Sequence, residues 1–285
     1  MSAALAGGYG VQYWGEGYAR DRLAASPHGL LILEMARVGA PWSATGREKF
    51  FDRADLEAIG QGGRRPVLAY LNLGELEPWR DYWTESGPPP GTGTLAENGE
   101  WLSSYWTDAW RSLVLARVER LLATGADGLF LDDVLHYYTH GTAPPVAPEM
   151  GAPVGATGHA AAMMELVLAV ATRARAIRCD AIIVVNNGAF IGRDAGPAQA
   201  ELFERYRDEI DGLLVEDAFG GADHPDLHAA LREDFLAAGR PVLAVEFGPS
   251  APAAVSRALA LGYVPYVAPG LAFDRLAPPP DSVTR

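Results

Sequence analysis

Residues 125–134 read GADGLFLDDV, and this stretch decides the fold class. A Gly/Asp turn leads into an apolar run that ends in two aspartates, Asp132 and Asp133. A run that is apolar at nearly every position is typical of a strand buried on both faces of a parallel sheet. Polar residues that directly follow such a strand lie at its carboxyl end, where α/β barrels build their sites.

The same pattern recurs along the chain. Apolar runs bounded by Gly, Pro or Asp predict eight strands, at residues 10–15, 29–34, 66–73, 128–134, 181–187, 212–219, 241–247 and 263–268. Stretches with helical spacing lie between them, at residues 47–59, 106–123, 160–177, 197–209, 225–238 and 251–261. This alternation predicts a (β/α)₈ TIM barrel, with residues 1–285 as one domain. A doubly wound open sheet is the alternative, but no Gly-rich phosphate loop follows the first strand.

Two segments depart from the plainest barrel. Residues 75–105 form a long Gly/Pro-rich, Trp-rich loop after the third strand, on the face where barrel enzymes place their sites. Residues 270–285 look too short and too proline-rich for a full closing helix.

Composition excludes several classes of partner. The net charge of −13, from 36 acids and 23 bases, argues against nucleic acid and suits a cationic substrate. A single cysteine excludes an intrachain disulfide and a multi-cysteine metal site. No run approaches the ~18 apolar residues of a membrane span, and the N-terminus carries no signal-like apolar run. We expect no cofactor and no membrane partner, and either a cytoplasmic chain or a secreted domain whose signal was removed.

Acids and amides dominate the predicted strand ends. They are Glu34, Asn72, Glu75, Asp132, Asp133, Asn186, Asn187, Glu216, Asp217 and Glu246. A single acid there often caps the next helix, but Glu is a poor N-cap and the pattern recurs on six consecutive strands. We therefore interpret these residues as functional, although Asn186 and Asn187 followed by Gly188 also suit a turn.

Paired carboxylates indicate glycoside cleavage. One carboxyl group can protonate the leaving oxygen while the other attacks or stabilises the oxocarbenium-like centre. Asp132 and Glu216 form the expected pair, with Glu246 as a possible substitute for Glu216. All seven tryptophans fall within the first 110 residues, and several crowd into the loop after the third strand. Their rings suit either stacking on sugars or anchoring that loop.

Three segments together resemble the endo-α-1,4-polygalactosaminidase family, glycoside hydrolase family 114. They are YLNLGELEPWRDYW at residues 70–83, GADGLFLDDV at 125–134 and LLVEDAF at 213–219. The resemblance implies a TIM barrel that hydrolyses α-1,4-linked galactosamine polymers, which are partly deacetylated and cationic. It also implies Asp132 as the nucleophile, Glu216 as the general acid/base and Glu75 and Arg80 as residues that shape the cleft, with retention of configuration weakly favoured. Leu135 and His136 depart from the family, because many relatives carry another acid there.

The expected site follows from both lines of reasoning. Beside the catalytic pair, the predicted substrate-binding residues are Tyr13, Glu34, Tyr70, Asn72, Glu75, Arg80, Trp83, Asp133, Asn186, Asn187, Glu246 and Tyr266. No metal is expected, although Asp132, Asp133, His136 and His140 offer ligand types. A catalytically inactive carbohydrate-binding barrel and a metal-assisted hydrolase remain the alternatives.

Overall fold

The computed structural model describes residues 1–15, 17–37, 48–96, 98–142, 151–220, 224–248 and 251–280. Arg47, where one helix was predicted to begin, and residues 281–285 of the predicted tail lie outside these ranges.

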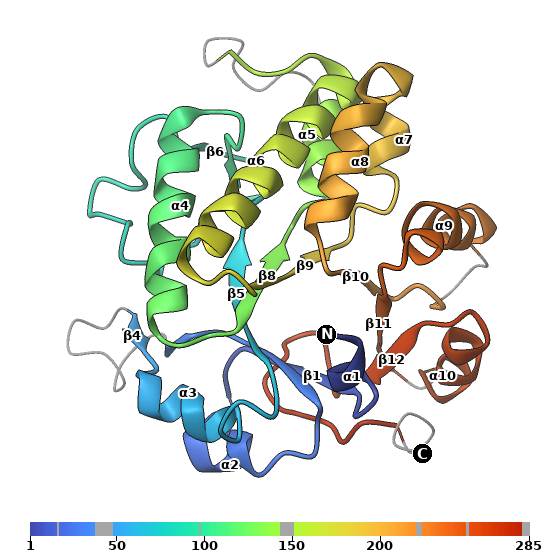
Figure 1. The fold of residues 1–285 in the computed structure, drawn as a ribbon. Helices are drawn as coiled ribbons and strands as arrows, with labels where there is room; N and C mark the ends of the chain where they lie inside the picture. The colour runs from blue at the N-terminus through green and yellow to red at the C-terminus, as the bar shows by residue number, and fades with distance from the viewer. Residues whose placement is uncertain are drawn as a thin grey trace.

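Eight parallel strands form one sheet in which neighbours along the sheet are also neighbours along the chain (Figure 1). The predicted (β/α)₈ fold is confirmed, and each strand lies within the range predicted for it, apart from one residue at the start of the first. The strands are β1 (Tyr9–Gln12), β2 (Leu30–Leu33), β5 (Val67–Asn72), β8 (Gly128–Asp132), β9 (Ile182–Asn186), β10 (Gly212–Glu216), β11 (Val242–Glu246) and β12 (Val264–Val267).

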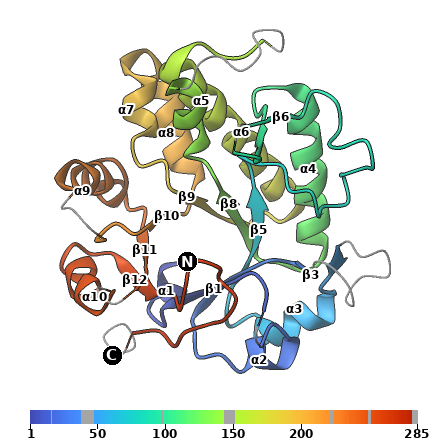
Figure 2. The ribbon, with the colours of Figure 1, turned by 180° about the vertical axis from the view of Figure 1, so that it is seen from behind.

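Helices surround the strands on the outside of the barrel (Figures 1 and 2). They are α2 (Arg20–Ala24), α3 (Arg53–Ile59), α4 (Asp108–Ala123), α5 (His136–Thr142), α6 (Gly155–Ile177), α7 (Ile191–Ala195), η2 (Pro197–Gln199), α8 (Ala200–Glu209), α9 (Pro225–Ala230), η3 (Leu231–Phe235), η4 (Leu236–Ala238) and α10 (Ala251–Ala260). Two short hairpins interrupt the alternation, β3 (Ala36–Arg37) with β4 (Lys49–Phe50), and β6 (Gly93–Leu95) with β7 (Trp101–Ser103). The second hairpin lies inside the predicted Trp-rich loop.

Two predicted helices were too long. The helix expected at residues 47–59 begins only at Arg53, because the Asp52 side chain accepts the backbone N–H of Asp55 at 2.8 Å and caps the first turn. The helix expected at residues 225–238 is α-helical only to Ala230 and then continues as a π turn and a 3₁₀ turn.

Alternation along the strands separates two apolar layers. In β9, Val184 packs inside the barrel with residues such as Leu214, whereas Val185 packs between the strands and the helices. Helix α1 (Ser2–Leu5) closes the amino end of the barrel, since Leu5 belongs to the inner layer.

The C-terminal tail covers the seam between β1 and β12. Residues 269–280 contain no helix, as predicted. The tail instead bonds to the strands: the Tyr13 N–H donates to the Phe273 carbonyl, and the Ala277 N–H donates to the Tyr266 hydroxyl. Tyr9 and Tyr266 pack across the seam with ring centroids 5.5 Å apart.

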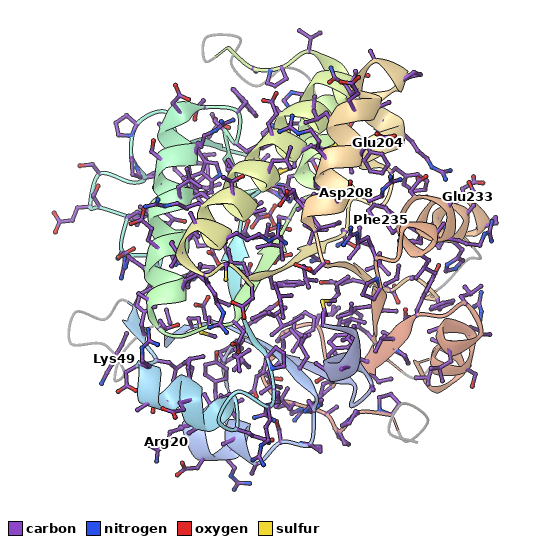
Figure 3. All side chains as sticks on the ribbon, in the orientation of Figure 1. Arg20, Lys49, Glu204, Asp208, Glu233 and Phe235 are labelled. Carbon is purple, nitrogen blue, oxygen red and sulfur yellow. The ribbon has the colours of Figure 1, made fainter. Side chains whose placement is uncertain are left out.

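Charged side chains lie on the outer helices, as Glu204 and Asp208 on α8 and Glu233 on η3 illustrate (Figure 3). Phe235, on the same turn as Glu233, is fully buried. Among the described helices, none has the length and apolar character needed to cross a membrane.

Candidate active site

Three neighbouring strands end in the same local geometry. The last residue of β8, β9 and β10 is Asp132, Asn186 and Glu216, and the residue after each has a positive φ: 56° at Asp133, 59° at Asn187 and 51° at Asp217. Asp and Asn tolerate this left-handed conformation better than other residues with a Cβ. The second member of each acid or amide pair in the sequence therefore suits this turn. The first member is the last residue of its strand and lies on the inner face of the barrel.

A single amide joins the proposed catalytic pair. Asn186 Nδ2 donates to Asp132 Oδ1 at 2.5 Å and to Glu216 Oε1 at 3.1 Å. The two carboxylate oxygens can therefore be no farther apart than the sum of these two lengths. Asn186 is buried, whereas Asp132 and Glu216 are partly exposed at the mouth of the barrel.

The environment of Glu216 favours its neutral form. Burial, followed by the negative charge of Asp132, raises the pKa of Glu216 to about 7, against the lowering effect of the Asn186 hydrogen bond. A carboxyl group with such a pKa is protonated in a large fraction of molecules near neutral pH and can act as a general acid.

Aromatic and amide groups line the mouth beside this pair. Asn72 Nδ2 donates to Asp133 Oδ2 at 2.6 Å and to the Tyr70 hydroxyl at 3.1 Å. The Tyr70 ring packs on Tyr13 with centroids 4.6 Å apart. Burial and then the charges of Asp132 and Glu216 raise the pKa of Tyr13, which places its ring in the field of the catalytic pair.

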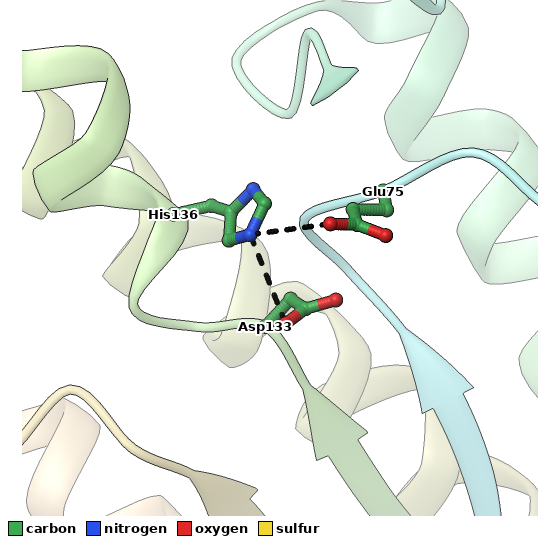
Figure 4. A group of neighbouring side chains, drawn as sticks. All are labelled: Glu75, Asp133 and His136. Atoms are coloured by element: carbon green, nitrogen blue, oxygen red, sulfur yellow. Dashed lines mark ion pairs between the residues drawn. The ribbon is translucent and has the colours of Figure 1, made fainter. Parts of the chain in front are cut away.

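A second group of polar side chains lies at the ends of β5 and β8 (Figure 4). His136 Nε2 is 3.5 Å from Glu75 Oε1 and 3.8 Å from Asp133 Oδ1. Gly74 permits this approach, because a Cβ there would lie 2.6 Å from the Asp133 Cβ and 2.8 Å from the His136 ring. The Gly-Glu pair of the sequence motif therefore has a steric role, and His136 joins the expected residues of the site.

Glu75, Asp133 and His136 form a triad. Its two carboxyl groups, on Glu75 and Asp133, resist ionisation. Burial, together with the charges of Glu100 and Asp132, raises the pKa of Glu75 to about 7. Burial and then the charges of Asp132 and Glu75 raise the pKa of Asp133. The ligand atoms of the triad lie within 4.8 Å of one another, so these residues could hold a divalent cation or a protonated amine.

Two predicted substrate-binding residues, Glu34 and Arg80, instead form buried ion pairs. Arg80 is 2% exposed and contacts Glu34 at 2.6 Å, Glu77 at 2.7 Å and Glu48 at 3.0 Å. Arg117 extends this buried ionic cluster by a hydrogen bond to Glu48. The Arg80 guanidinium also lies 5.9 Å from the centre of the Tyr70 ring. Glu34 and Arg80 are therefore paired with each other in a buried cluster beside Tyr70, which differs from the substrate contact expected for them.

Glu246 and Tyr266 do not face the mouth as expected. Glu216 pairs with Val245 across β10 and β11, so Glu246 lies one residue beyond that row and on the opposite face of the sheet. Glu246 is 1% exposed and lies on the helix side of β11, where burial raises its pKa and the backbone N–H groups of Ala218 and Phe219 oppose that rise. Tyr266 is fully buried inside the barrel and anchors the tail. The alternative of Glu246 as the second catalytic acid is inconsistent with this placement.

Trp83 and Asn187, also predicted to bind substrate, have structural roles in this fold. Trp83 is partly buried and packs edge-on against Trp101 at 5.3 Å, which anchors the long loop. Asn187 forms the turn after β9, and its Oδ1 lies 3.4 Å from the Glu216 backbone nitrogen.

Known proteins of similar sequence and structure match this architecture. An uncharacterised protein of Deinococcus radiodurans is 30% identical over 90% of this chain and 80% of its own length. The glycoside hydrolase domain of PelA from Pseudomonas aeruginosa has a TM-score of 0.58 at 18% identity, covering 93% of this chain and 96% of that domain. Ega3 from Aspergillus fumigatus, solved in complex with galactosamine, has a TM-score of 0.60 at 14% identity, covering 91% and 89%.

The family assignment rests on a match to a family model. The model of glycoside-hydrolase family GH114 matches residues 52–268, which include β5 to β12 and every side chain of the catalytic pair and the triad. The chain therefore belongs to glycoside-hydrolase family GH114.

Proposed function

We propose that this protein hydrolyses an α-1,4-linked, partly deacetylated galactosamine polysaccharide by a retaining mechanism that uses Asp132 and Glu216. The observation that carries the proposal is the shared Asn186 amide, which holds one oxygen of each carboxylate within hydrogen-bonding distance of the same nitrogen. This bridge brings the two bonded oxygens close together, which suits the ~5–5.5 Å between the carboxyl groups of retaining enzymes better than the ~6.5–9.5 Å of inverting ones.

The roles follow from the two environments. Protonated Glu216 donates its proton to the glycosidic oxygen while Asp132 attacks the anomeric carbon, and the bond from that carbon to the leaving oxygen breaks. The products of this step are an alcohol at the leaving chain and a glycosyl ester on Asp132. Glu216, now ionised, then removes a proton from water, which attacks the ester and restores both carboxyl groups.

The triad supports an amino sugar as the substrate. Asp133 and Glu75 are carboxyl groups whose pKa values are raised, in part, by neighbouring negative charges. The Arg80 guanidinium does not offset these charges, because it is bound to Glu34, Glu48 and Glu77. A substrate ammonium beside Asp133 and Glu75 would relieve their repulsion, which a neutral sugar would not. The galactosamine bound by Ega3 is a sugar of this class.

The test is release of reducing ends from partly deacetylated α-1,4-galactosamine polymer. We expect cleavage by the wild type and its loss in Asp132→Asn and Glu216→Gln, with unchanged thermal unfolding as the control for folding. NMR of the first-formed product should show the α-anomer. Activity retained in either variant would contradict the assigned pair, and a first-formed β-anomer would contradict retention.

A control substrate and a chelator separate the alternatives. Fully N-acetylated polymer should be cleaved more slowly than the partly deacetylated polymer if an ammonium binds at the triad. Activity should survive EDTA, since the proposed steps need no metal. Loss of activity in EDTA with recovery on adding a divalent cation would favour a metal-assisted hydrolase. Binding of the polymer without cleavage would favour a carbohydrate-binding barrel.

A further inference from the structure

Trp14 is an exposed indole that the structure holds in one place. The side chain is 54% exposed, among the most exposed large apolar residues of the described ranges, yet its Nε1 donates to the Ala272 carbonyl at 2.9 Å. This bond joins the loop after β1 to the tail after β12. An exposed apolar side chain is ordinary by itself, but one held rigid at a site of function is suited to a ligand.

The backbone of this loop is also fixed. Gln12 Nε2 donates both to the Trp14 carbonyl at 2.9 Å and to the Asp274 carbonyl at 3.1 Å. Gly15 has a φ of 88°, and a Cβ there would lie 2.3 Å from the Asp274 carbonyl oxygen. The loop and the tail therefore pack backbone against backbone, and the indole loses little further freedom when it binds a ligand.

The position of Trp14 places it at the rim of the candidate active site. It directly follows Tyr13, whose ring packs on Tyr70 at 4.6 Å and on Phe273 at 5.2 Å at the mouth of the barrel. Burial and then the charges of Asp132 and Glu216 raise the pKa of Tyr13, which is consistent with this position. Trp14 is one residue farther out on the same carboxyl-end loop.

We propose that Trp14 is a stacking platform for a sugar residue of the polysaccharide, at a subsite on the rim beyond the two rings that the cleaved bond joins. The inference rests on the proposed function and adds a binding residue to it. The flat C–H face of a sugar covers apolar indole surface and removes it from water. A platform on the rim also binds the chain away from the reacting bond, so its effect depends on the length of the substrate.

Kinetics on oligosaccharides of increasing length test this subsite. We compare kcat/KM for wild type, Trp14→Ala and Trp14→Phe on purified α-1,4-galactosamine oligomers, from the shortest that is cleaved to the longest soluble fragment. For Trp14→Ala we expect the ratio of kcat/KM on long to short oligomers to fall about 5- to 20-fold, mainly through KM. Trp14→Phe should lose less, because it keeps a flat ring without the Nε1 donor.

Leu271→Ala is the matched control. Leu271 is 76% exposed on the same tail segment and makes no part of the proposed subsite, so its removal should leave the length dependence unchanged. A merely structural role for Trp14 would lower activity on all lengths equally and would lower the unfolding temperature. Either of those results, without a change in the length ratio, would overturn the proposal.

A binding measurement makes the outcome independent of turnover. Isothermal titration of the longest oligomer into Asp132→Asn, and into the same variant carrying Trp14→Ala, should show weaker binding by about 5- to 20-fold in the second. Equal affinities would contradict the platform. If the wild type neither binds nor cleaves the polymer, the proposed function itself fails, which is a different result from cleavage that ignores Trp14.

Discussion

The two halves of the barrel mouth carry acids at their strand ends but use them differently. On β5, β8, β9 and β10 the last residues are Asn72, Asp132, Asn186 and Glu216. The Asn186 amide donates to Asp132 and Glu216, and the Asn72 amide donates to Asp133, the residue after β8. On β2 and β11 the corresponding acids are Glu34, bound to Arg80, and Glu246, turned toward the helices.

The difference lies in what surrounds each acid. Asp132 and Glu216 have amide partners and partial exposure, whereas Glu34 and Glu246 are 4% and 1% exposed. Carboxylates of the first kind are free to react with a substrate, and those of the second kind hold the structure. An acid at a strand end therefore indicates a catalytic role only when the face of the sheet on which it lies and its bonding partners are known.

The largest expected effect contrasts Glu216 with Glu246. Glu216→Gln should lower kcat by about 10³–10⁵-fold, because it removes the proton donor. Glu246→Gln should change kcat less than about tenfold, because its side chain lies on the other face of β11. The measurement is the rate of reducing-end release at saturating polymer. Comparable losses in both variants would abolish the distinction between the two halves.

The next effect concerns the buried ionic cluster. Arg80→Met should destabilise the protein by about 3–5 kcal/mol, because Glu34 and Glu77 would be left buried without their cation, while Glu48 would keep only Arg117. Chemical denaturation measures this change.

The matched control is Arg173→Met, which breaks an exposed pair with Glu119. It should cost less than about 1 kcal/mol. Equal losses in the two variants would show that the cluster adds nothing beyond a surface ion pair.

A smaller effect sharpens the role of Asn186. In the wild type, kcat/KM should fall as the pH rises through about 7, because Glu216 must be protonated in the free enzyme. Asn186→Ala removes the hydrogen bond that lowers this pKa, so the alkaline limb should move to higher pH. We also expect kcat to fall about 10- to 100-fold, since the carboxylates lose their shared donor. An alkaline limb that moves to lower pH in Asn186→Ala would contradict the proposed effect of Asn186 on the pKa of Glu216.

The sequence predicted the strand ends well because they depend on local patterns. Short apolar runs place β8 and β10 and the acids after them, and the row containing Asn72, Asp132 and Asn186 follows directly from these endings. What the sequence could not give is register between strands. The runs LLVED and LAVEF look alike, yet Glu216 pairs with Val245, so Glu216 and Glu246 face opposite sides.

Contacts between segments distant in the chain could not be predicted from the sequence either. The sequence predicts Arg80 as a residue of the cleft, but Glu34 and Glu48 come from another part of the chain and meet it only in the folded protein. The role of His136 depends on the close approach that Gly74 permits between two loops. The Gly-Glu pair in the sequence was the signal for that approach, and its physical meaning required the structure.

The smallest effect tests the other half of the mouth through stability. Burial, and then the charge of Asp217, raises the pKa of Glu246 from 4.5 to about 7 in the folded protein. Because the folded pKa lies above the unfolded one, the wild type loses folding free energy as the pH rises from about 4.5 through about 7, and glutamine loses none.

Glu246→Gln should therefore be more stable relative to wild type at pH 8–9 than at pH 4, by about 1–3 kcal/mol. Thermal unfolding across this range measures the difference, with the exposed Glu57→Gln as the control. A constant difference between variant and wild type would mean that Glu246 titrates normally and is open to solvent. In that case the contrast between the two halves would reduce to the engagement of Glu34 by Arg80.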